Sequence, residues 1–338
     1  MKQSLVGAAV LLVGFIILTI PSGAIPSISG TSPPPAEAAA APEPTSELTP
    51  SPVPSADASP PPSETPYELY DPSPVPAPTA DPSSDGGTRI LAMTIPADDT
   101  LDNDTYYNID AEELLSEEVE LSLPKDGYQI LIIHTHSTEA YAQNPDDLYE
   151  ENAAYRTLDP AYSVIRVGSE LAAALEQYGL NVLHCTTVFD YPSYNGSYVR
   201  SGEAVEEYLA AYPGIGIVID LHRDAIGEGD TIYKTMANID GVYAAQLLFV
   251  MGSDVNLENP NWRENLKLAL TLQTAANARY GSLMRPTNLC AYRYNQQLSP
   301  GSLLLEAGTA GNTLDEALCA VRLFAETAGP VLASLVEE

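Results

Sequence analysis

The sequence predicts an α/β fold with a mostly parallel mixed sheet flanked by helices. Short runs rich in Val, Ile and Leu, little broken by charge, are typical of buried strands. Such runs occur at 130–134, 181–183, 215–221, 247–251 and 303–306. Longer segments with helical spacing alternate with them, as in folds with a parallel sheet. The part after residue 88 is long enough for one domain with a sizeable core.

Three segments carry helix signals. Residues 162–178 place apolar residues at helical intervals and are followed by Gly179, a common helix stop. Thr313 and Glu316 have the spacing of a capping box, which predicts that a helix starts there. Residues 261–280, rich in Leu and Ala, are expected to form another long helix.

The chain begins with two segments that are expected to lie outside this domain. Residues 1–22 contain an uncharged run that is short for a spanning helix of ~20 residues and long for a signal-peptide core. We expect an uncleaved membrane anchor, with a cleaved signal segment as the alternative. The lone Lys2 favours a single-pass protein of the cell membrane whose main domain is extracytoplasmic. Residues 23–88, rich in Pro, Ala, Ser and acids, are expected to be a disordered linker.

The remaining chain divides into a lead-in and a main domain. Residues 89–124 are expected to be the lead-in, with a short acidic helix within 108–121, and residues 125–338 the main domain. Whether the lead-in packs on the domain or waits for a partner stays open from sequence. Asp240-Gly241 predicts a hairpin turn that adds an antiparallel piece to the sheet.

Charge and cysteine content exclude some functions. The net charge is −32, with 46 acidic against 14 basic residues. Such a chain repels phosphate backbones, so nucleic acid is not expected as a partner. Cys185, Cys290 and Cys319 form no Cys-x-x-Cys pair. We therefore expect small buried thiols in place of a zinc knuckle or a redox site.

Four residues with catalytic chemistry follow strand-like runs. His136 and Glu139 come after the first run, His222 ends the run at 215–221, and Glu306 ends the last one. In open α/β sheets, functional sites gather at the carboxyl ends of strands. Imidazole nitrogen and carboxylate oxygen are zinc ligands, and a catalytic site leaves the fourth position to water. We therefore predict that His136, Glu139 and His222 hold Zn²⁺, with Glu306 as general base.

Two further residues have open roles. His134 lies two positions before His136, on the same strand face, so it is either an alternative ligand or a partner behind the ligands. Arg223 is expected either to steady the oxyanion or to grip a substrate carboxylate. A salt bridge from Arg223 to Asp224 or another nearby acid is the structural alternative.

Several motifs in order also resemble a known family. They are His134-Thr-His-Ser-Thr-Glu-Ala-Tyr141, Ser193-Tyr-Asn-Gly-Ser-Tyr198, Asp220-Leu-His-Arg-Asp224, Arg293-Tyr-Asn-Gln-Gln-Leu-Ser-Pro-Gly301, Leu305-Glu-Ala-Gly308 and Asn312-Thr-Leu-Asp-Glu-Ala317. Across residues 89–333 the chain resembles stage II sporulation protein P, a family of membrane-anchored peptidoglycan hydrolases. The resemblance implies an N-acetylmuramoyl-L-alanine amidase that acts in septal wall remodelling during sporulation engulfment. Cleavage of peptide cross-links is also attributed to the family.

The same resemblance implies partners and leaves alternatives. It implies peptidoglycan as substrate and partnership with stage II sporulation proteins D, a lytic transglycosylase, and M, a membrane scaffold. The loop with His136 and Glu139 also resembles that of zinc carboxypeptidases, which use a later His and a late Glu base on a related α/β fold. Two other functions therefore stay open, a zinc carboxypeptidase acting on wall peptides and a non-catalytic peptidoglycan-binding module.

Overall fold

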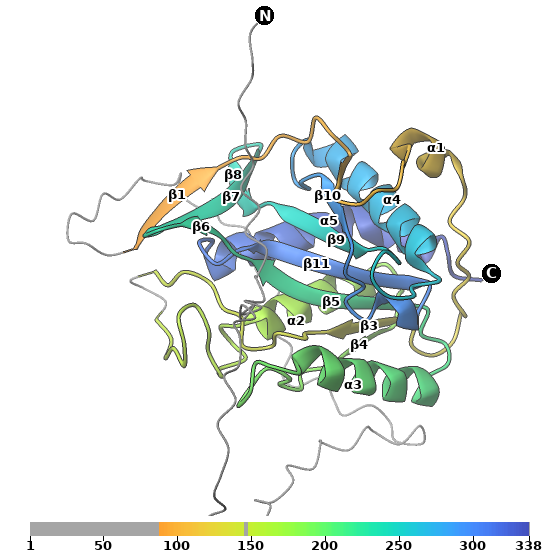
Figure 1. The fold of residues 1–338 in the computed structure, drawn as a ribbon, viewed down its shortest axis with the longest axis horizontal. Helices are drawn as coiled ribbons and strands as arrows, with labels where there is room; N and C mark the ends of the chain where they lie inside the picture. The colour runs from red at the N-terminus through yellow and green to blue at the C-terminus, as the bar shows by residue number, and fades with distance from the viewer. Residues whose placement is uncertain (1–87, 145–147, 338) are drawn as a thin grey trace, which may run out of the picture. The chain divides into compact units, whose positions relative to one another are not determined.

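A mixed sheet of seven strands forms the centre of the molecule, in the order β2-β10-β9-β11-β5-β3-β4 (Figure 1). The computed structural model describes residues 88–144 and 148–337, so the expected anchor (1–22) and all of the expected linker except residue 88 lie outside the described residues. The strands are β2 (Leu101–Asn103), β3 (Ile130–Ile133), β4 (Val182–His184), β5 (Ile217–Asp224), β9 (Leu247–Gly252), β10 (Thr287–Cys290) and β11 (Gly301–Thr309). Neighbouring strands are parallel except β9 and β11, which confirms the predicted mostly parallel mixed sheet.

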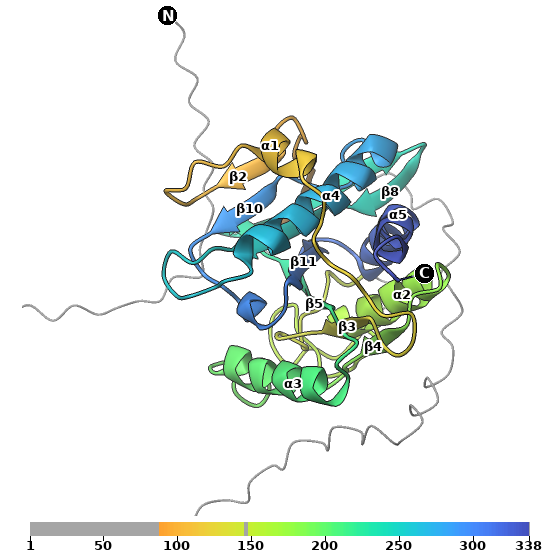
Figure 2. The same cartoon turned by 90° about the vertical axis from the view of Figure 1, so that its right-hand side faces the viewer.

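Helices cover both faces of this sheet (Figure 2). On one face lie α2 (Val164–Glu176), α4 (Trp262–Tyr280) and α5 (Leu314–Ala333), and on the other lies α3 (Ser197–Ala211). Shorter helices are α1 (Ala111–Ser116) and the 3₁₀ turn η1 (Gln296–Leu298). The capping box of Thr313 and Glu316 is present at the start of α5, as predicted. The three longer helices predicted from sequence and the short acidic helix predicted within 108–121 are all confirmed, whereas α3 was not predicted.

A smaller sheet stands beside the main one. It pairs β1 (Arg89–Met93), β6 (Ile226–Glu228) and β8 (Val242–Ala245) with β7 (Thr231–Ile239). The turn between β7 and β8 is the predicted hairpin, since Asp240 and Gly241 have φ values of 53° and 89°. The hairpin belongs to the smaller sheet, however. The antiparallel pair of the main sheet is β9 and β11.

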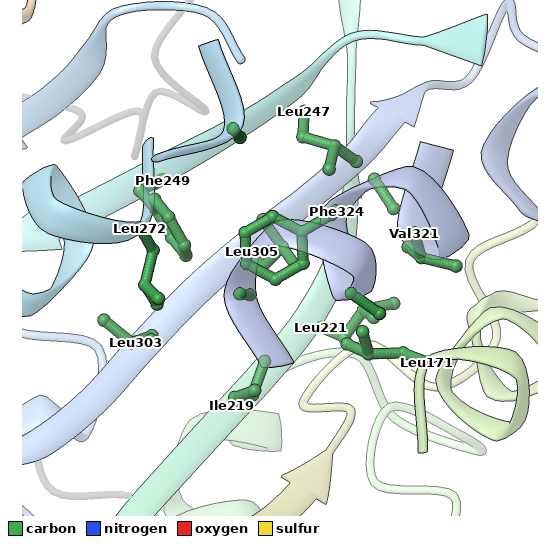
Figure 3. Close-up of a cluster of buried hydrophobic side chains, with 14 of the residues drawn as sticks. Leu171, Ile219, Leu221, Leu247, Phe249, Leu272, Leu303, Leu305, Val321 and Phe324 are labelled. Carbon is green, nitrogen blue, oxygen red and sulfur yellow. The ribbon is translucent and has the colours of Figure 1, made fainter. Parts of the chain in front are cut away.

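The main core lies between the sheet and the helices α2, α4 and α5. Figure 3 shows Phe324 of α5 surrounded by aliphatic side chains of three neighbouring strands. Phe324 also meets Phe249 of β9 edge to face, with the ring centres 5.9 Å apart. The side chains labelled there are nearly all inaccessible to solvent: Leu171, Ile219, Leu221, Leu247, Phe249, Leu272, Leu303, Leu305, Val321 and Phe324. This apolar layer fixes the strands whose ends carry the site.

The opposite face of the sheet is covered only in part. Val205 of α3 packs in one cluster with side chains of β3 and β5, namely Leu131, Ile133 and Val218. On the same face further along the sheet, Leu248 and Val250 of β9 and Asn288 and Cys290 of β10 are only half-buried. Strand register places all of these side chains on one side, because in-register neighbours point the same way.

The lead-in packs on the domain, which settles the question left open by the sequence. Its strands β1 and β2 pair with β7 and β10, so both sheets include it. Leu114 is 2% exposed, and the Tyr107 ring stacks on Trp262 of α4 at 4.9 Å. Lys267 of α4 donates to the Glu118 carbonyl at 3.0 Å. Across the described residues, none of the helices combines the length and apolarity needed to span a bilayer.

All three cysteines are described, and none forms a disulfide. Cys185 and Cys319 are buried among apolar side chains, as expected, and Cys290 is half-buried.

Candidate active site

The carboxyl ends of β3, β5 and β11 bring the predicted residues together. After β3 the chain makes a tight turn in which the Glu139 N–H donates to the His136 carbonyl at 3.0 Å. In the parallel pair of β5 and β11, His222 lies directly opposite Glu306. Opposite residues point to the same face, so both side chains lie on the α3 side of the sheet. Three strand ends far apart in sequence thus supply one cluster.

His222 lies between two carboxylates. Its Nδ1 is 3.4 Å from Glu139 Oε2, and its Nε2 is 2.9 Å from Asp220 Oδ1. Asp220 is itself fixed by Thr135, whose N–H and hydroxyl donate to it at 2.8 and 2.7 Å. Burial alone would lower the pKa of His222, but the two carboxylates outweigh it and raise this pKa well above its ordinary value. The imidazole is held in one orientation by carboxylates on both sides.

His136 lies beside His222, with ring centres 5.3 Å apart. Its ring stacks on Tyr194 at 4.5 Å, and Tyr194 Oη is 3.1 Å from Nε2. Ser197 Oγ is 3.4 Å from Nδ1. Burial lowers the pKa of His136 to about 4, so the ring is neutral at neutral pH. A neutral imidazole is the form that binds a metal ion.

Glu306 has one oxygen without a partner. Its Oε2 is buried and accepts no hydrogen bond among the described residues. Burial raises the pKa of Glu306 to about 8, and the charge of Asp224 acts in the same direction. Arg285 pairs with Asp224 at 2.8 Å and is near enough for its charge to oppose this rise. A buried polar atom left unpaired costs free energy, and such atoms are common where a site awaits a reactant.

Two arginines hold Glu139 from the side away from His222. Arg156 Nη2 lies 3.3 Å from Glu139 Oε1, and its Nη1 pairs with the buried Asp190 at 2.6 Å. Arg223 Nη1 lies 3.8 Å from the same oxygen of Glu139. Burial raises the pKa of Glu139, but Arg223 and His222 outweigh burial and keep this pKa well below its usual range. Glu139 is therefore ionised and fixed in place.

Arg223 is not placed as the sequence suggested. Its Nε donates to the Ala140 carbonyl at 2.9 Å and its Nη2 to the Tyr155 carbonyl at 3.0 Å. With 8% of the residue exposed, the guanidinium braces the loop that carries Glu139 and has no face toward a substrate. The alternative prediction, that Arg223 forms a salt bridge with a nearby acidic residue, is confirmed, and this residue is Glu139. Asp224 pairs with Arg285.

His134 lies on the other face of the sheet. Its Nδ1 is 2.8 Å from the Leu221 carbonyl and its Nε2 is 2.8 Å from His184 Nε2. The ring packs against Gly168 of α2, where an added Cβ would be 2.6 Å away. The prediction that His134 and His136 lie on one strand face is wrong, because β3 ends at Ile133 and the chain then turns. The structure does not bring His134 to the cluster.

The residues of the cluster are of the types that bind zinc, but they are not already arranged around an ion. Within the described part of the chain, no group of three or more His, Cys, Asp or Glu side chains is arranged as a ready-made metal site. The donor types nevertheless fit, since two imidazoles and an ionised carboxylate are buried side by side. Because the pKa of His222 is raised, its imidazole must lose a proton when a metal ion binds. His222 Nε2 has an ion-pair neighbour but makes no hydrogen bond of good geometry. Binding through His136 requires one of its nitrogens to leave Tyr194 Oη or Ser197 Oγ.

Sequence reasoning missed several residues of the cluster. Asp220 was detectable, because it lies two positions before His222 and so shares its strand face. Arg156, Asp190 and Tyr194 come from irregular loops, and Arg285 from the segment before β10. No short-range pattern links these four residues to the strand ends.

Comparisons with known proteins agree on one family. The family model described as Stage II sporulation protein P matches residues 92–328. The Stage II sporulation protein P of Bacillus subtilis (strain 168) is 27% identical over 254 residues, which cover 68% of this chain. This chain spans 59% of the length of that relative, less than two thirds.

Two of the solved structures with partial similarity are described as amidases. The N-acetylmuramoyl-L-alanine amidase AmiC2 of Nostoc punctiforme aligns with a TM-score of 0.35 and 14% identity, covering 61% of this chain and 95% of that one. The catalytic domain of CwlV, an N-acetylmuramoyl-L-alanine amidase from Bacillus (Paenibacillus) polymyxa var. colistinus, aligns with a TM-score of 0.36 and 11% identity, covering 61% and 97%. Scores this low leave the family model, which spans most of the domain, as the decisive comparison. The chain belongs to the stage II sporulation protein P family.

Proposed function

We propose that this chain is a zinc-dependent peptidoglycan hydrolase that cleaves the amide between N-acetylmuramic acid and the L-alanine of the stem peptide. The observation that carries the proposal is the buried, unpaired Glu306 Oε2 directly opposite His222. Family membership supports wall hydrolysis during sporulation as the setting. Cleavage of peptide cross-links is the second reaction that the same chemistry allows.

His136, Glu139 and His222 would hold the ion. A bound zinc ion supplies Lewis-acid activation of a water molecule and of the amide carbonyl. Arg156 and Arg223 keep Glu139 ionised for this role, and Asp220 fixes the His222 ring.

Glu306 is the proton carrier of the reaction. In its ionised form, which a pKa of about 8 makes the minor form at neutral pH, it accepts a proton from the attacking water as the new carbon–oxygen bond forms at the amide carbon. It then gives this proton to the nitrogen as the carbon–nitrogen bond breaks, which leaves a carboxylic acid on the lactoyl group and a free amine on L-alanine. Because water, not a side chain of the protein, attacks the amide carbon, no covalent intermediate with the protein is needed.

The alternatives receive less support. A carboxypeptidase needs a cation for the terminal carboxylate of its substrate, and Arg223, the candidate from sequence, spends its donors on Ala140, Tyr155 and Glu139. A binding module has no use for a buried carboxylate oxygen without a partner.

Location and partners are part of the proposal. We place the domain outside the cell membrane, anchored through residues 1–22 and reaching the wall through the linker. As a coil, a linker of this length has an r.m.s. span of roughly 45 Å. Stage II sporulation proteins D and M are the proposed partners, from family membership alone.

The test is product analysis with the full chain on purified peptidoglycan. With zinc present, we expect stem peptides with a free N-terminal L-alanine by mass spectrometry, and loss of these products with chelator or in Glu306→Gln. Glu206→Gln, an exposed carboxamide control on α3, should leave the products unchanged. Release of single C-terminal residues would instead identify a carboxypeptidase, and binding without products would identify a binding module.

A further inference from the structure

Three tyrosines extend from the candidate site along the α3 side of the sheet. The Tyr198 ring is parallel to His222 within 13°, with ring centres 6.4 Å apart. Tyr294 follows at 5.6 Å from Tyr198, and Tyr292 at 6.3 Å from Tyr294. Tyr198 and Tyr294 are half-buried, whereas Tyr292, at the far end of this tyrosine row, is 52% exposed. The row therefore connects a candidate metal ligand to the surface.

The backbone is strained where the row is built. Tyr294 and Asn295 have φ values of 45° and 60°, the left-handed region that bulky residues rarely enter. Such residues persist where the surroundings hold them. Asn295 Nδ2 donates to the Tyr198 carbonyl at 2.7 Å, which ties the loop to α3. A Cβ on Gly252 would lie 2.1 Å from the Tyr292 carbonyl oxygen, so β9 supports the loop from below.

The row borders the part of the sheet that α3 leaves uncovered. Leu248 of β9 lies opposite Glu306 in the register, and Val250 and Asn288 continue the same face away from the site. All three of these side chains are half-buried. The Tyr294 ring contacts both the Tyr198 and the Tyr292 rings, and the row begins beside His222, which lies opposite Glu306 in the pairing of β5 and β11.

The chemistry of this surface suits an uncharged sugar ring better than a peptide. Tyrosine offers a rigid apolar face and a hydroxyl at low conformational cost. A pyranose has an apolar C–H face that packs on such a ring and hydroxyls at its edge. The charged groups of the cluster instead gather around Glu139 and His222. Since the scissile amide joins a sugar to a peptide, the two parts of the substrate must leave the site in different directions.

We infer that the tyrosine row, Tyr198, Tyr294 and Tyr292, is a saccharide subsite that binds the glycan strand flanking the scissile amide. This inference rests on the proposed function and names the direction in which its substrate extends. Tyr292 supplies the outermost ring, so it contacts a sugar beyond the one that carries the cleaved peptide.

The test compares two substrates that share one stem peptide. One is N-acetylmuramoyl-tripeptide, and the other carries the same peptide on a tetrasaccharide of alternating N-acetylglucosamine and N-acetylmuramic acid. For the full chain with zinc, kcat/KM should be higher on the tetrasaccharide. Tyr292→Ala should lower the ratio of the two kcat/KM values by roughly three- to tenfold, the size expected for one aromatic contact. Tyr292→Phe keeps the ring face and should keep the ratio.

Two further variants separate recognition from folding. Tyr294→Gly removes a second ring of the row, so the ratio should fall; because the lost ring packing lowers thermal stability, both kcat/KM values are measured well below the melting temperature of the variant. Tyr178→Ala, which removes a ring that packs on α5 away from the row, is the control for such a loss and should leave the ratio unchanged. A ratio that stays at the wild-type value in Tyr292→Ala and Tyr294→Gly would overturn the inference.

Binding of a glycan without a peptide tests the subsite separately from hydrolysis. The peptide-free tetrasaccharide should bind the full chain carrying Glu306→Gln in calorimetry, and Tyr292→Ala should weaken that binding by a similar factor. Absence of hydrolysis on both substrates, with tyrosine-dependent glycan binding intact, would count against the proposed function alone. Glycan binding that is absent, or indifferent to Tyr292, would count against the subsite.

Discussion

Two pairs of histidines lie on opposite faces of the main sheet, and they differ in how their partners are arranged. His134 and His184 satisfy each other and the Leu221 carbonyl, in a closed pair without a carboxylate in hydrogen-bond range. His136 and His222 lie among Glu139, Asp220 and Glu306, and one oxygen of Glu306 has no partner. Burial alone therefore does not mark a site. The second pair differs because it combines two imidazoles, three carboxylates and a buried oxygen without a hydrogen bond, which is costly unless something else uses that oxygen.

The largest expected difference between the pairs is in activity. His222→Ala removes a predicted zinc ligand and should lower peptidoglycan hydrolysis by about a thousandfold or more. His184→Gln keeps a hydrogen-bonding group beside His134 and should stay within about tenfold of wild type. Dye release from labelled peptidoglycan measures both variants. Equal losses in the two would mean that the pairs do not differ in function.

The next effect concerns the residue that orients His222. Asp220→Asn keeps the size of the side chain but removes the charge beside Nε2, so activity should fall by about 10- to 100-fold. Zinc affinity, followed by competition with a chromogenic chelator, should fall with it. Glu206→Gln removes an exposed carboxylate on α3 and serves as the control. Unchanged affinity in Asp220→Asn would show that the carboxylate does not position the ligand.

A substitution that crowds the closed pair of His134 and His184 should lower the stability of the fold. In an ordinary helix interior, Gly→Ala stabilises by about 0.5–1 kcal/mol. At Gly168 the new Cβ would lie 2.6 Å from the His134 ring and 2.7 Å from His184, and both rings are buried. Gly168→Ala should therefore lower the free energy of unfolding by about 1–3 kcal/mol, as overpacked cores do. Urea unfolding measures this, and a stabilised variant would show that the pair has room to move.

The smallest effect is a pH dependence of the closed pair. Burial lowers the pKa of His134 to about 4 and that of His184 well below its ordinary value of 6.5. Between these values the unfolded chain binds more protons, so stability is full above about pH 6.5 and falls as the pH drops toward 4. His184→Gln removes one titrating group and should make this fall shallower by about 1 kcal/mol between pH 6.5 and 5. Urea unfolding at a series of pH values would contradict the account if the two slopes were the same.

The sequence predicted the strands of the main sheet and the meeting of their carboxyl ends. Each apolar run from Ile130 to Glu306 proved to be a strand, and parallel pairing brought their carboxyl ends together. The pattern was clear because these runs are rich in Val, Ile and Leu and contain few charged residues. The helix α3 was missed because its buried residues are mainly small, Ser197, Ser201, Gly202 and Val205, and carry little apolar periodicity.

The partners of the site residues were harder to predict. Arg223 looked available because it follows a ligand, yet the loop around Tyr155 folds back and takes its donors. Arg156, Asp190 and Arg285 reach the cluster through long-range packing that no local spacing encodes. His134 and His136 diverge because a turn begins one residue after Ile133, and turn positions are set by tertiary bonds such as Thr135 to Asp220.

The most direct measurement is the zinc content of the full chain and two variants, purified in parallel and analysed by inductively coupled plasma mass spectrometry after dialysis against zinc. The account predicts one zinc ion per wild-type chain, one in His184→Gln and none in His222→Ala. Zinc retained without His222, or lost without His184, would contradict the assignment of the metal site to the cluster of His136, Glu139 and His222.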